Sequence, residues 1–478
     1  MSESPSGEAS GGGRRRSRRR ITIIGILVAL VAAGGSYLGV SLTSGGGLTT
    51  SWTGNHLASG CASTSDNVPW TAGDLAVTCS GHGVAAYRLG SGQVAWTWEP
   101  PKSPGAAALR GPGPSKQAGT PYLSILELSA GTSDGIGVAE YTYGAGTVYL
   151  AGIQVATGRE LWRRSDVSVT DGSTVWVSDG RVAVVASTSN SADAVRVYDL
   201  TSGALDWSST AGGVPARGCY AQTVAIAGAS VYAVASCPPT GGTRDDQLYQ
   251  LALATGAVRG HAALQDSSCS SADGYPTLWA VPGYVLSGCQ SAPQTSPDVL
   301  VIPAGGVRQL QLSYRGDPKY VNFLSSDLMP PAMTVYGTTL YLATSLNVGD
   351  KSVYLASAVD LRTDTLRWDK TVSIPGEAAS SVTYPVNLIG ASSQGALDVV
   401  ENISADAEDL TGTTAMTLAV LSASNGTVTY GPGATYSDGL NDQPLYNLIG
   451  HTLLALPVCA LADCDVANEP AAVTAYDT

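Results

Sequence analysis

Residues 198–207, YDLTSGALDW, decide the fold of this chain. An apolar, strand-like run ends at Asp199, a tight turn follows, and a second strand then reaches Trp207. Gly203 stands where a hairpin turn needs a left-handed residue. Asp199 can accept backbone N–H bonds within the turn, and Trp207 is a flat side chain that can fill the gap between neighbouring sheets. The pattern is therefore structural.

The pattern recurs along the chain, in most copies with an aromatic residue four positions after the turn glycine. The other copies are YRLGSGQVAW (Gly92, Trp96), IQVATGRELW (Gly158, Trp162), LALATGAVRG (Gly256), VDLRTDTLRW (Asp360, Asp364, Trp368) and LSASNGTVTY (Gly426, Tyr430), with a degenerate IPAGGVRQL at Gly306. Two more strand-like runs precede each turn, so each repeat has about four short strands. Such units, joined by loops of variable length, stack radially into a β-propeller.

The two ends of the chain complete one further repeat. The chain ends in VTAYDT, the front half of one more copy. Leu48–Trp52 (LTTSW) is strand-like, carries a Trp and precedes the first complete repeat. We expect it to supply the missing strand and to close the ring. The predicted fold class is all-β, an eight-bladed propeller over residues 48–478, with seven blades as the alternative.

The turns resemble the PQQ-like repeat, whose pattern is a strand, Asp-x-x-Thr-Gly and then Trp. The match is good at Asp199–Trp207, at Thr157–Trp162 apart from Gln154 in the Asp position, and at Asp360–Trp368 apart from Asp364 in the Gly position. Repeat-like features cover about Trp52 to Thr478. The chain is similar to membrane-anchored PQQ-like propeller proteins of high-GC Gram-positive bacteria.

The resemblance implies the fold and transfers no catalytic residue. The superfamily contains quinoprotein dehydrogenases and non-enzymatic members, such as the scaffold used in outer-membrane protein assembly. The dehydrogenases stack the quinone beside a pair of adjacent cysteines and bind Ca²⁺ with acidic and amide side chains. This sequence has no Cys-Cys pair. We therefore expect no cofactor.

The N-terminal segment predicts a membrane anchor. Ile21–Leu42 contains 22 residues without a charge, and a helix of this length spans roughly 33 Å, enough to cross a bilayer. Six arginines in Arg14–Arg20 precede it and predict a cytoplasmic N-terminus. Residues 1–20 are then a disordered basic tail, residues 43–47 a tether, and the propeller lies outside. A cleaved signal peptide is the alternative, with the same export direction.

The charge of the exported part excludes a class of partner. Beyond Leu42 lie 19 of the 25 basic and 36 of the 38 acidic residues, which gives a net charge of −17. Nucleic-acid binding needs a basic face, so it is not expected. The expected partners are the membrane, through Ile21–Leu42, and an envelope protein or a cell-wall glycan.

All eight cysteines lie beyond the apolar segment, and an even number in an exported domain predicts disulfides. Cys219 and Cys237 are symmetric about Gly228-Ala229, as expected for facing positions of a hairpin. The predicted pairs are Cys61–Cys79, Cys219–Cys237, Cys269–Cys289 and Cys459–Cys464. No CxxC motif occurs and the four histidines are scattered, which disfavours zinc.

No catalytic or metal site is predicted. Asp245-Asp246, the acidic stretch Asp406–Asp409 and His82 are interpreted as solvated loop residues. The expected function is a non-catalytic binding or scaffold module in the cell envelope. The alternatives are a PQQ-dependent dehydrogenase and an extracytoplasmic sensor that signals through a partner.

Overall fold

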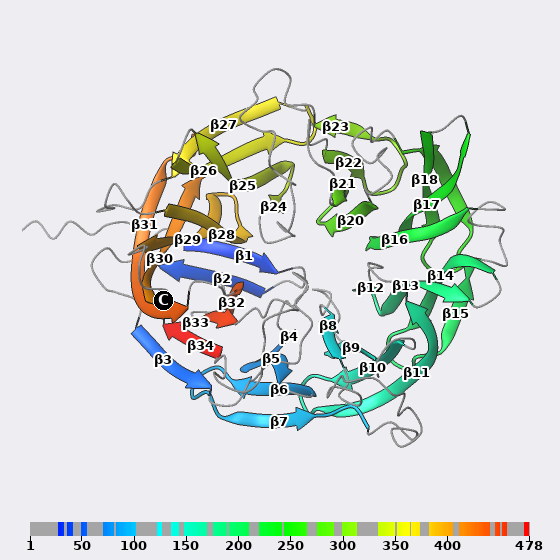
Figure 1. Cartoon of the computed structure of the whole chain (residues 1–478), viewed down its shortest axis with the longest axis horizontal. Helices are drawn as coiled ribbons and strands as arrows, with labels where there is room; N and C mark the ends of the chain where they lie inside the picture. The colour runs from blue at the N-terminus through cyan, green and yellow to red at the C-terminus, as the bar shows by residue number, and fades with distance from the viewer. Residues whose placement is uncertain are drawn as a thin grey trace, which may run out of the picture.

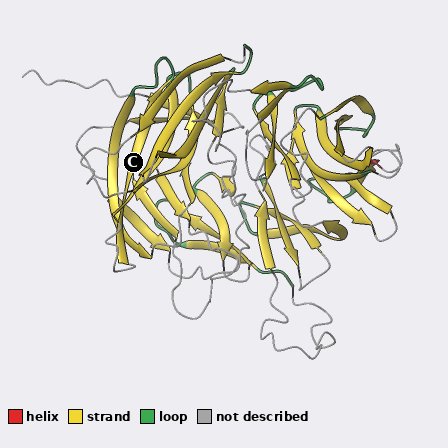
Figure 2. Ribbon diagram, turned by 45° about the horizontal axis from the view of Figure 1, so that its top comes forward, coloured by secondary structure: helices red, strands yellow, loops and turns green. Residues whose placement is uncertain are grey.

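A computed structural model describes residues 27–32, 36–41, 49–54, 70–80, 83–101, 122–126, 135–142, 148–169, 175–188, 191–209, 219–240, 243–264, 275–290, 299–312, 333–348, 351–363, 365–372, 382–404, 411–439, 445–449, 452–456 and 473–477. Regular structure in these residues is almost entirely β-strand (Figure 2). The all-β prediction is confirmed.

The strands form six four-stranded antiparallel sheets, one eight-stranded sheet and a hairpin of β1 and β2. The eight-stranded sheet divides into two halves of four strands, which only two residue pairs join, Ser168 with Ser187 and Val169 with Ala186. Each group of four strands is called a unit, numbered in chain order. The units form a ring with the first strand of each nearest the centre (Figure 1).

The first four units contain sixteen consecutive strands. They are unit 1, β4 (Trp70–Ala72), β5 (Leu75–Ser80), β6 (Gly83–Arg88) and β7 (Val94–Trp98); unit 2, β8 (Tyr122–Leu126), β9 (Ile136–Thr142), β10 (Val148–Gln154) and β11 (Arg159–Val169); unit 3, β12 (Val175–Ser178), β13 (Arg181–Thr188), β14 (Ser191–Asp199) and β15 (Leu205–Ser208); and unit 4, β16 (Tyr220–Ala227), β17 (Ser230–Thr240), β18 (Thr243–Ala252) and β19 (Val258–Ala263).

The remaining units follow the same order, and the last one uses both ends of the chain. They are unit 5, β20 (Tyr275–Val281), β21 (Tyr284–Gln290), β22 (Val299–Pro303) and β23 (Leu310–Leu312); unit 6, β24 (Met333–Tyr336), β25 (Thr339–Val348), β26 (Lys351–Asp360) and β27 (Thr365–Val372); unit 7, β28 (Val382–Ala391), β29 (Gly395–Ser404), β30 (Thr411–Ser422) and β31 (Val428–Gly439); and unit 8, β32 (Leu445–Ile449), β33 (Thr452–Leu456), β34 (Val473–Asp477) and β3 (Thr49–Gly54).

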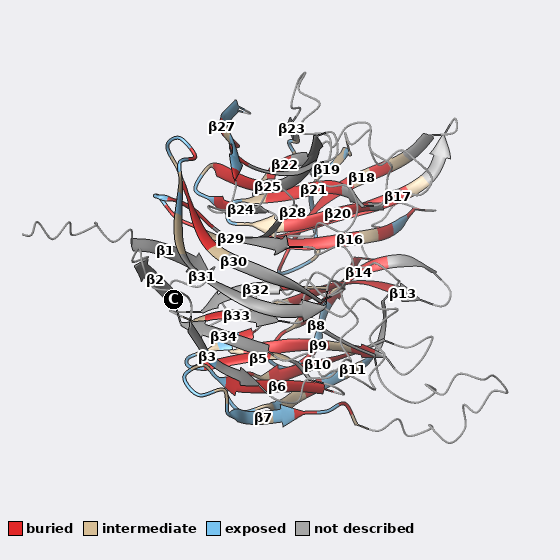
Figure 3. Cartoon of the chain, turned by 60° about the vertical axis from the view of Figure 1, so that its left-hand side comes forward, coloured by how far each residue is buried: buried red, intermediate tan, exposed pale blue. Residues whose placement is uncertain are grey.

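Each sheet buries both of its faces, because it packs against a neighbouring unit on either side. In β13, Ala183 and Val185 belong to the core shared with unit 4, whereas Val182 and Val184 belong to the core shared with unit 2. Successive side chains of a strand point to opposite faces. A strand in the middle of a sheet therefore reads as a nearly continuous apolar run, and such strands, β6 among them, are largely buried, whereas β7 at the edge is largely exposed (Figure 3).

The ring closes through the chain ends. β3 pairs antiparallel with β34, with Thr49 opposite Asp477 and Thr50 opposite Tyr476. The prediction that Leu48–Trp52 completes the last repeat is confirmed, with the strand at Thr49–Gly54.

The connections between strands lie on two opposite faces of the ring. In units 1 to 7 the first and second strands, and the third and fourth, are joined at one face, called the turn face. There the Leu200 N–H bonds to the Gly180 carbonyl at 2.9 Å, which ties the two turns of unit 3 together. Connections between the second and third strands, and between units, lie at the opposite, loop face.

The apolar N-terminal segment differs from the prediction of a helix over Ile21–Leu42. Leu27–Ala32 (β1) and Ser36–Ser41 (β2) pair as an antiparallel hairpin. The segment contains β-branched Val28, Val31 and Val40, which favour strands, and Gly34-Gly35, which disfavours a helix interior. Within the described residues, no helix is long and apolar enough to cross a membrane.

Candidate functional site

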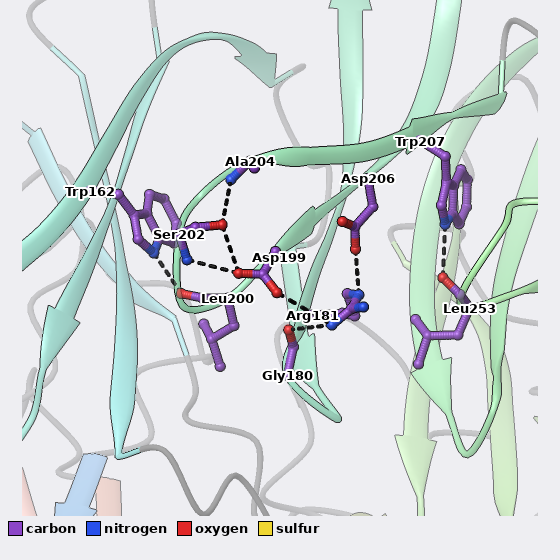
Figure 4. A network of polar contacts seen from close by, with 10 residues as sticks. All are labelled: Trp162, Gly180, Arg181, Asp199, Leu200, Ser202, Ala204, Asp206, Trp207 and Leu253. Carbon is purple, nitrogen blue, oxygen red and sulfur yellow. Dashed lines mark hydrogen bonds and ion pairs between the residues drawn. The ribbon is translucent and has the colours of Figure 1, made fainter.

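The tryptophans of the repeat join four of the units to the unit that follows. Trp207 of unit 3 donates its indole N–H to the Leu253 carbonyl of unit 4 at 2.7 Å, and Trp162 donates to Leu200 at 2.5 Å (Figure 4). The same bond joins Trp96 to Val155 at 2.9 Å and Trp368 to Ala423 at 3.2 Å. A buried indole needs such a partner. These residues thus hold the ring together.

The turn glycines receive the rings of these tryptophans. A Cβ on Gly203 would lie 2.6 Å from the Trp162 ring, and a Cβ on Gly256 would lie 2.6 Å from the Trp207 ring. The corresponding distance is 2.5 Å for Gly158 against Trp96 and for Gly426 against Trp368. These glycines, with Gly92, also have positive φ. The turn therefore needs glycine for its backbone conformation and, where a ring lies on it, for space.

Asp199 fastens the turn from within. Its Oδ1 accepts the Ser202 N–H at 2.8 Å and the Ser202 hydroxyl at 2.7 Å, and Arg181 lies 3.5 Å from its Oδ2 (Figure 4). Arg181 also pairs with Asp206. The Ser202 hydrogen bond is the main reason that the pKa of Asp199 is lowered. This network stabilises a turn and presents no reactive group to a cavity.

Asp360 has the same position in unit 6. Its side chain accepts the Arg362 N–H at 3.0 Å and pairs with Arg367 at 2.6 Å. The Arg367 hydrogen bond holds the pKa of Asp360 below its usual value. Tyr430, in the tryptophan position of unit 7, packs against the core that contains Trp368. Asp364 lies outside the described residues.

Units 4 and 5 lack the tryptophan. Gly260 stands in its place in unit 4, and Val307 of unit 5 approaches within 3.3 Å of where its Cβ would lie. These units still share an apolar core, and a hydrogen bond is added to it: the Gly305 N–H donates to the Tyr232 hydroxyl at 2.8 Å. Burial raises the pKa of Tyr232. In unit 5, Leu310 occupies the position.

Trp176 supports these units from the inside, a role that the sequence analysis missed. It lies on β12, the innermost strand of unit 3, and packs against the cores between units 3 and 4, 4 and 5, and 5 and 6. Its buried indole N–H has no hydrogen-bond partner in the part of the chain that the structure describes. The only sequence signal was a Trp in an apolar run, which does not distinguish an axial residue from an ordinary core residue.

The described strands that line the ring axis, called the axial wall, are uncharged. The innermost strands are β4, β8, β12, β16, β20, β24, β28 and β32 (Figure 1), and none contains Asp, Glu, Lys, Arg or His. Their polar groups are hydroxyls, amides and the indoles of Trp70, Trp176 and Trp279. Gln222 on β16, for example, has both amide atoms buried without a partner among the described residues. Of the side chains that serve in general acid–base chemistry, these strands contain tyrosines alone.

The disulfide between Cys219 and Cys237 is present, as predicted, with the Cα atoms 4.1 Å apart. The turn of this hairpin pairs Ala227 with Ser230. Continued without interruption, that register would place Cys219 opposite Pro238. A β-bulge at Gln222 shifts the register by one residue and brings the cysteines together. Each of the other three predicted pairs includes a cysteine outside the described residues: Cys61, Cys269, Cys459 and Cys464.

The remaining candidates do not converge. Asp246 is buried and accepts the Ser236 hydroxyl at 2.5 Å, and Asp245 accepts the Gln247 amide at 2.5 Å. His261 stacks on Tyr249 with ring centroids 6.0 Å apart. His82 and Asp406–Asp409 fall outside the described residues. Among the described residues, no three His, Cys, Asp or Glu side chains cluster as a metal site.

Comparison with known proteins identifies the repeat. Residues 127–274 match the profile of the family described as "Outer membrane protein assembly factor BamB". Over this span, about a third of the chain, the repeats are similar to those of that family. No curated protein sequence matches the chain.

Solved propellers show low sequence identity. BamB from Moraxella catarrhalis is 14% identical, covers 90% of this chain and 100% of its own, and has a TM-score of 0.43. The quinohemoprotein alcohol dehydrogenases of Pseudomonas putida HK5 and Comamonas testosteroni are each 12% identical, cover 90% of this chain and 76% of their own, and have TM-scores of 0.49 and 0.47. At these values, neither activity nor partners transfer.

The described residues do not fit the quinone that some PQQ-like propellers bind. That cofactor carries several carboxylates and is held with Ca²⁺, so its seat needs cationic and acidic side chains. The innermost strands contain neither, and the partly buried Trp176 packs against the cores of the units.

Proposed function

We propose that this chain is a membrane-anchored, non-catalytic binding module of the cell envelope, built on an eight-bladed ring. Each unit is one blade, and unit 8 closes the ring. The observation that carries the proposal is the uncharged axial wall. A propeller enzyme needs catalytic acids, bases or metal ligands where substrate meets the axis, and the innermost strands contain no Asp, Glu, Lys, Arg, His or Cys.

The distinctive residues of the sequence support the same conclusion. The repeat tryptophans and glycines contact one another across units, and Asp199 and Asp360 are satisfied inside their own turns. What remains for recognition is the surface of a rigid ring, where loops carry binding residues. We place the partner site on the loop face, whose connections vary most in length. The partner is an envelope protein or a cell-wall glycan.

Membrane attachment belongs to this proposal on the strength of the sequence. Six arginines precede 22 uncharged residues. In a bilayer a two-stranded hairpin leaves backbone groups at both edges without partners, whereas a helix satisfies them all. The segment 21–42 therefore adopts the helix when it enters lipid. Resistance of the full-length protein to alkaline extraction from membranes tests this, and release by alkali contradicts it.

Crosslinking in cells tests the binding function. A photo-crosslinking residue is placed on the loop face of the full-length protein, at Lys351 or Thr243, and at a turn-face position, Thr255, as the matched control. One recurrent envelope protein or glycan fragment captured from the loop face alone supports the module. Equal capture from both faces contradicts the placement of the site.

A dehydrogenase assay tests the alternative activity. The purified full-length protein is mixed with pyrroloquinoline quinone and Ca²⁺, and dye reduction is followed with alcohols and sugars. We expect no dye reduction above the protein-free control. Saturable reduction that requires both additions would overturn the non-catalytic assignment.

A further inference from the structure

The topology places the start of the ring at the turn face. β3 is the outermost strand of unit 8, and its first residue, Thr49, lies opposite Asp477, the last residue of β34. In the other units this junction between the third and fourth strands is a turn of the turn face. The chain therefore passes from its apolar N-terminal segment into the ring at the turn face.

The same face has exposed apolar side chains. Among the described residues, the exposed large hydrophobics are Val94, Leu205, Tyr220, Val258, Tyr336 and Leu366. All but Tyr220 lie at the turn-face end of a strand. Val94, Leu205, Val258 and Leu366 are equivalent, each two residues before the tryptophan position of its unit, and are 43–50% exposed. Singly such residues would need no explanation, but these recur at the equivalent place in four units, so the turn face presents them together.

Cationic side chains accompany them. Arg159, Arg259, Arg308 and Arg362 follow or lie within turns of this face, are exposed, and form no ion pair within the described part of the chain. The exported part as a whole has a net charge of −17. Asp179 is an exposed carboxylate on the same face. Four unpaired arginines against this acidic background match an anionic surface.

We propose that the turn face rests on the surface of the membrane in which the chain is anchored. The inference rests on the proposed anchor at residues 21–42. From Thr43 to Leu48 are six residues, whose extended reach is at most about 20 Å, so Thr49 stays close to the lipid. The arginines meet anionic headgroups, each worth about 1 kcal/mol, and the aliphatic side chains enter the headgroup boundary. The loop face is thereby directed away from the membrane, toward partners.

Site-specific quenching tests the orientation. The full-length protein is reconstituted into vesicles of equal parts phosphatidylcholine and phosphatidylglycerol, with a small fraction of headgroup-spin-labelled lipid. A fluorescent amino acid replaces Val258 or Leu366 on the turn face, or Tyr220 on the loop face as the matched control. We expect quenching several-fold greater at positions 258 and 366 than at 220. Equal quenching, or stronger quenching at 220, overturns the orientation.

The two proposals fail in different ways. Release of the protein from the vesicles by alkali overturns both the anchor and the orientation, whereas retention with equal quenching overturns the orientation alone.

The charge of the turn-face arginines gives a second readout. The double variant Arg159→Gln/Arg259→Gln should reduce quenching at position 366, whereas Arg244→Gln/Lys351→Gln, at the loop face, should leave it unchanged. Identical responses of both double variants would contradict a role for the turn-face arginines.

Discussion

The indole of Trp207 lies directly on the backbone of Gly256, in the next unit of the ring. The indole N–H bonds to Leu253 at 2.7 Å, and the ring lies 2.6 Å from where a Cβ on Gly256 would stand. Gly256 also has a φ of 68°. Gly256 is thus required twice: by its own backbone conformation and by the Trp207 ring that packs on it. Single substitutions can separate the two requirements.

Gly256→Ala should destabilise the protein more than Gly228→Ala. Both glycines have positive φ, but a Cβ on Gly228 meets nothing within 4 Å. Gly228→Ala therefore reports backbone strain alone, about 1–2 kcal/mol, whereas Gly256→Ala adds a clash of roughly 1–3 kcal/mol. Chemical denaturation measures both.

A double variant identifies the source of the extra cost. In the double variant Gly256→Ala/Trp207→Ala the clash is absent. Its loss of stability should therefore be smaller than the sum of the losses of Gly256→Ala and Trp207→Ala. Additive losses, or equal losses for the two single glycine variants, would refute the contact.

Trp207→Phe should destabilise the protein more than Trp176→Phe. The first change leaves the Leu253 carbonyl without its donor, which costs about 1–3 kcal/mol. The second removes an indole N–H that has no partner, and the gain from removing it offsets the lost packing. The two substitutions change volume equally. A larger loss for Trp176→Phe in thermal unfolding would contradict this account.

Asp360 should make stability depend on pH in the acid range. Its pKa is lowered in the folded state, so its contribution is complete above the unfolded pKa of about 4 and is lost as pH falls through the folded value. Thermal unfolding of the wild type and of Asp360→Asn should differ near neutral pH and converge in acid. A difference that is constant with pH would show that Asp360 acts by shape alone.

The Cys219–Cys237 disulfide should contribute roughly 3 kcal/mol, because it closes a loop with a sequence separation of 18 residues. Denaturation of Cys219→Ser/Cys237→Ser measures the loss. Peptide mapping without reductant should recover the 219–237 pair and tests the three other predicted pairs. Recovery of Cys219 joined to any other cysteine would contradict the structure.

Ring closure should depend on β3. Of two adjacent residues in a strand, one directs its N–H toward the partner strand, so Thr49→Pro/Thr50→Pro removes a bond to β34. We expect a lower melting temperature and self-association through the freed edge. Thr49→Ala/Thr50→Ala is the control. If the proline variant matches the alanine variant in melting temperature and light scattering, closure does not rest on this pairing.

The sequence by itself determined the repeat and the chemistry of its turns. Gly203, Asp199 and Trp207 lie within one hairpin, so their spacing records local backbone requirements that no distant residue can change. The same locality revealed the Cys219–Cys237 hairpin and the half repeat that β3 completes.

Tertiary structure alone decided what these residues meet. The tryptophan of one unit packs on the turn glycine of the next. The number of residues between the two varies from unit to unit, so no fixed spacing in the sequence encodes the contact. The bulge at Gln222, the axial place of Trp176 and the uncharged axial wall follow from the order of strands within and between sheets. That order is set by simultaneous packing of both faces of every sheet, which is a property of the whole ring.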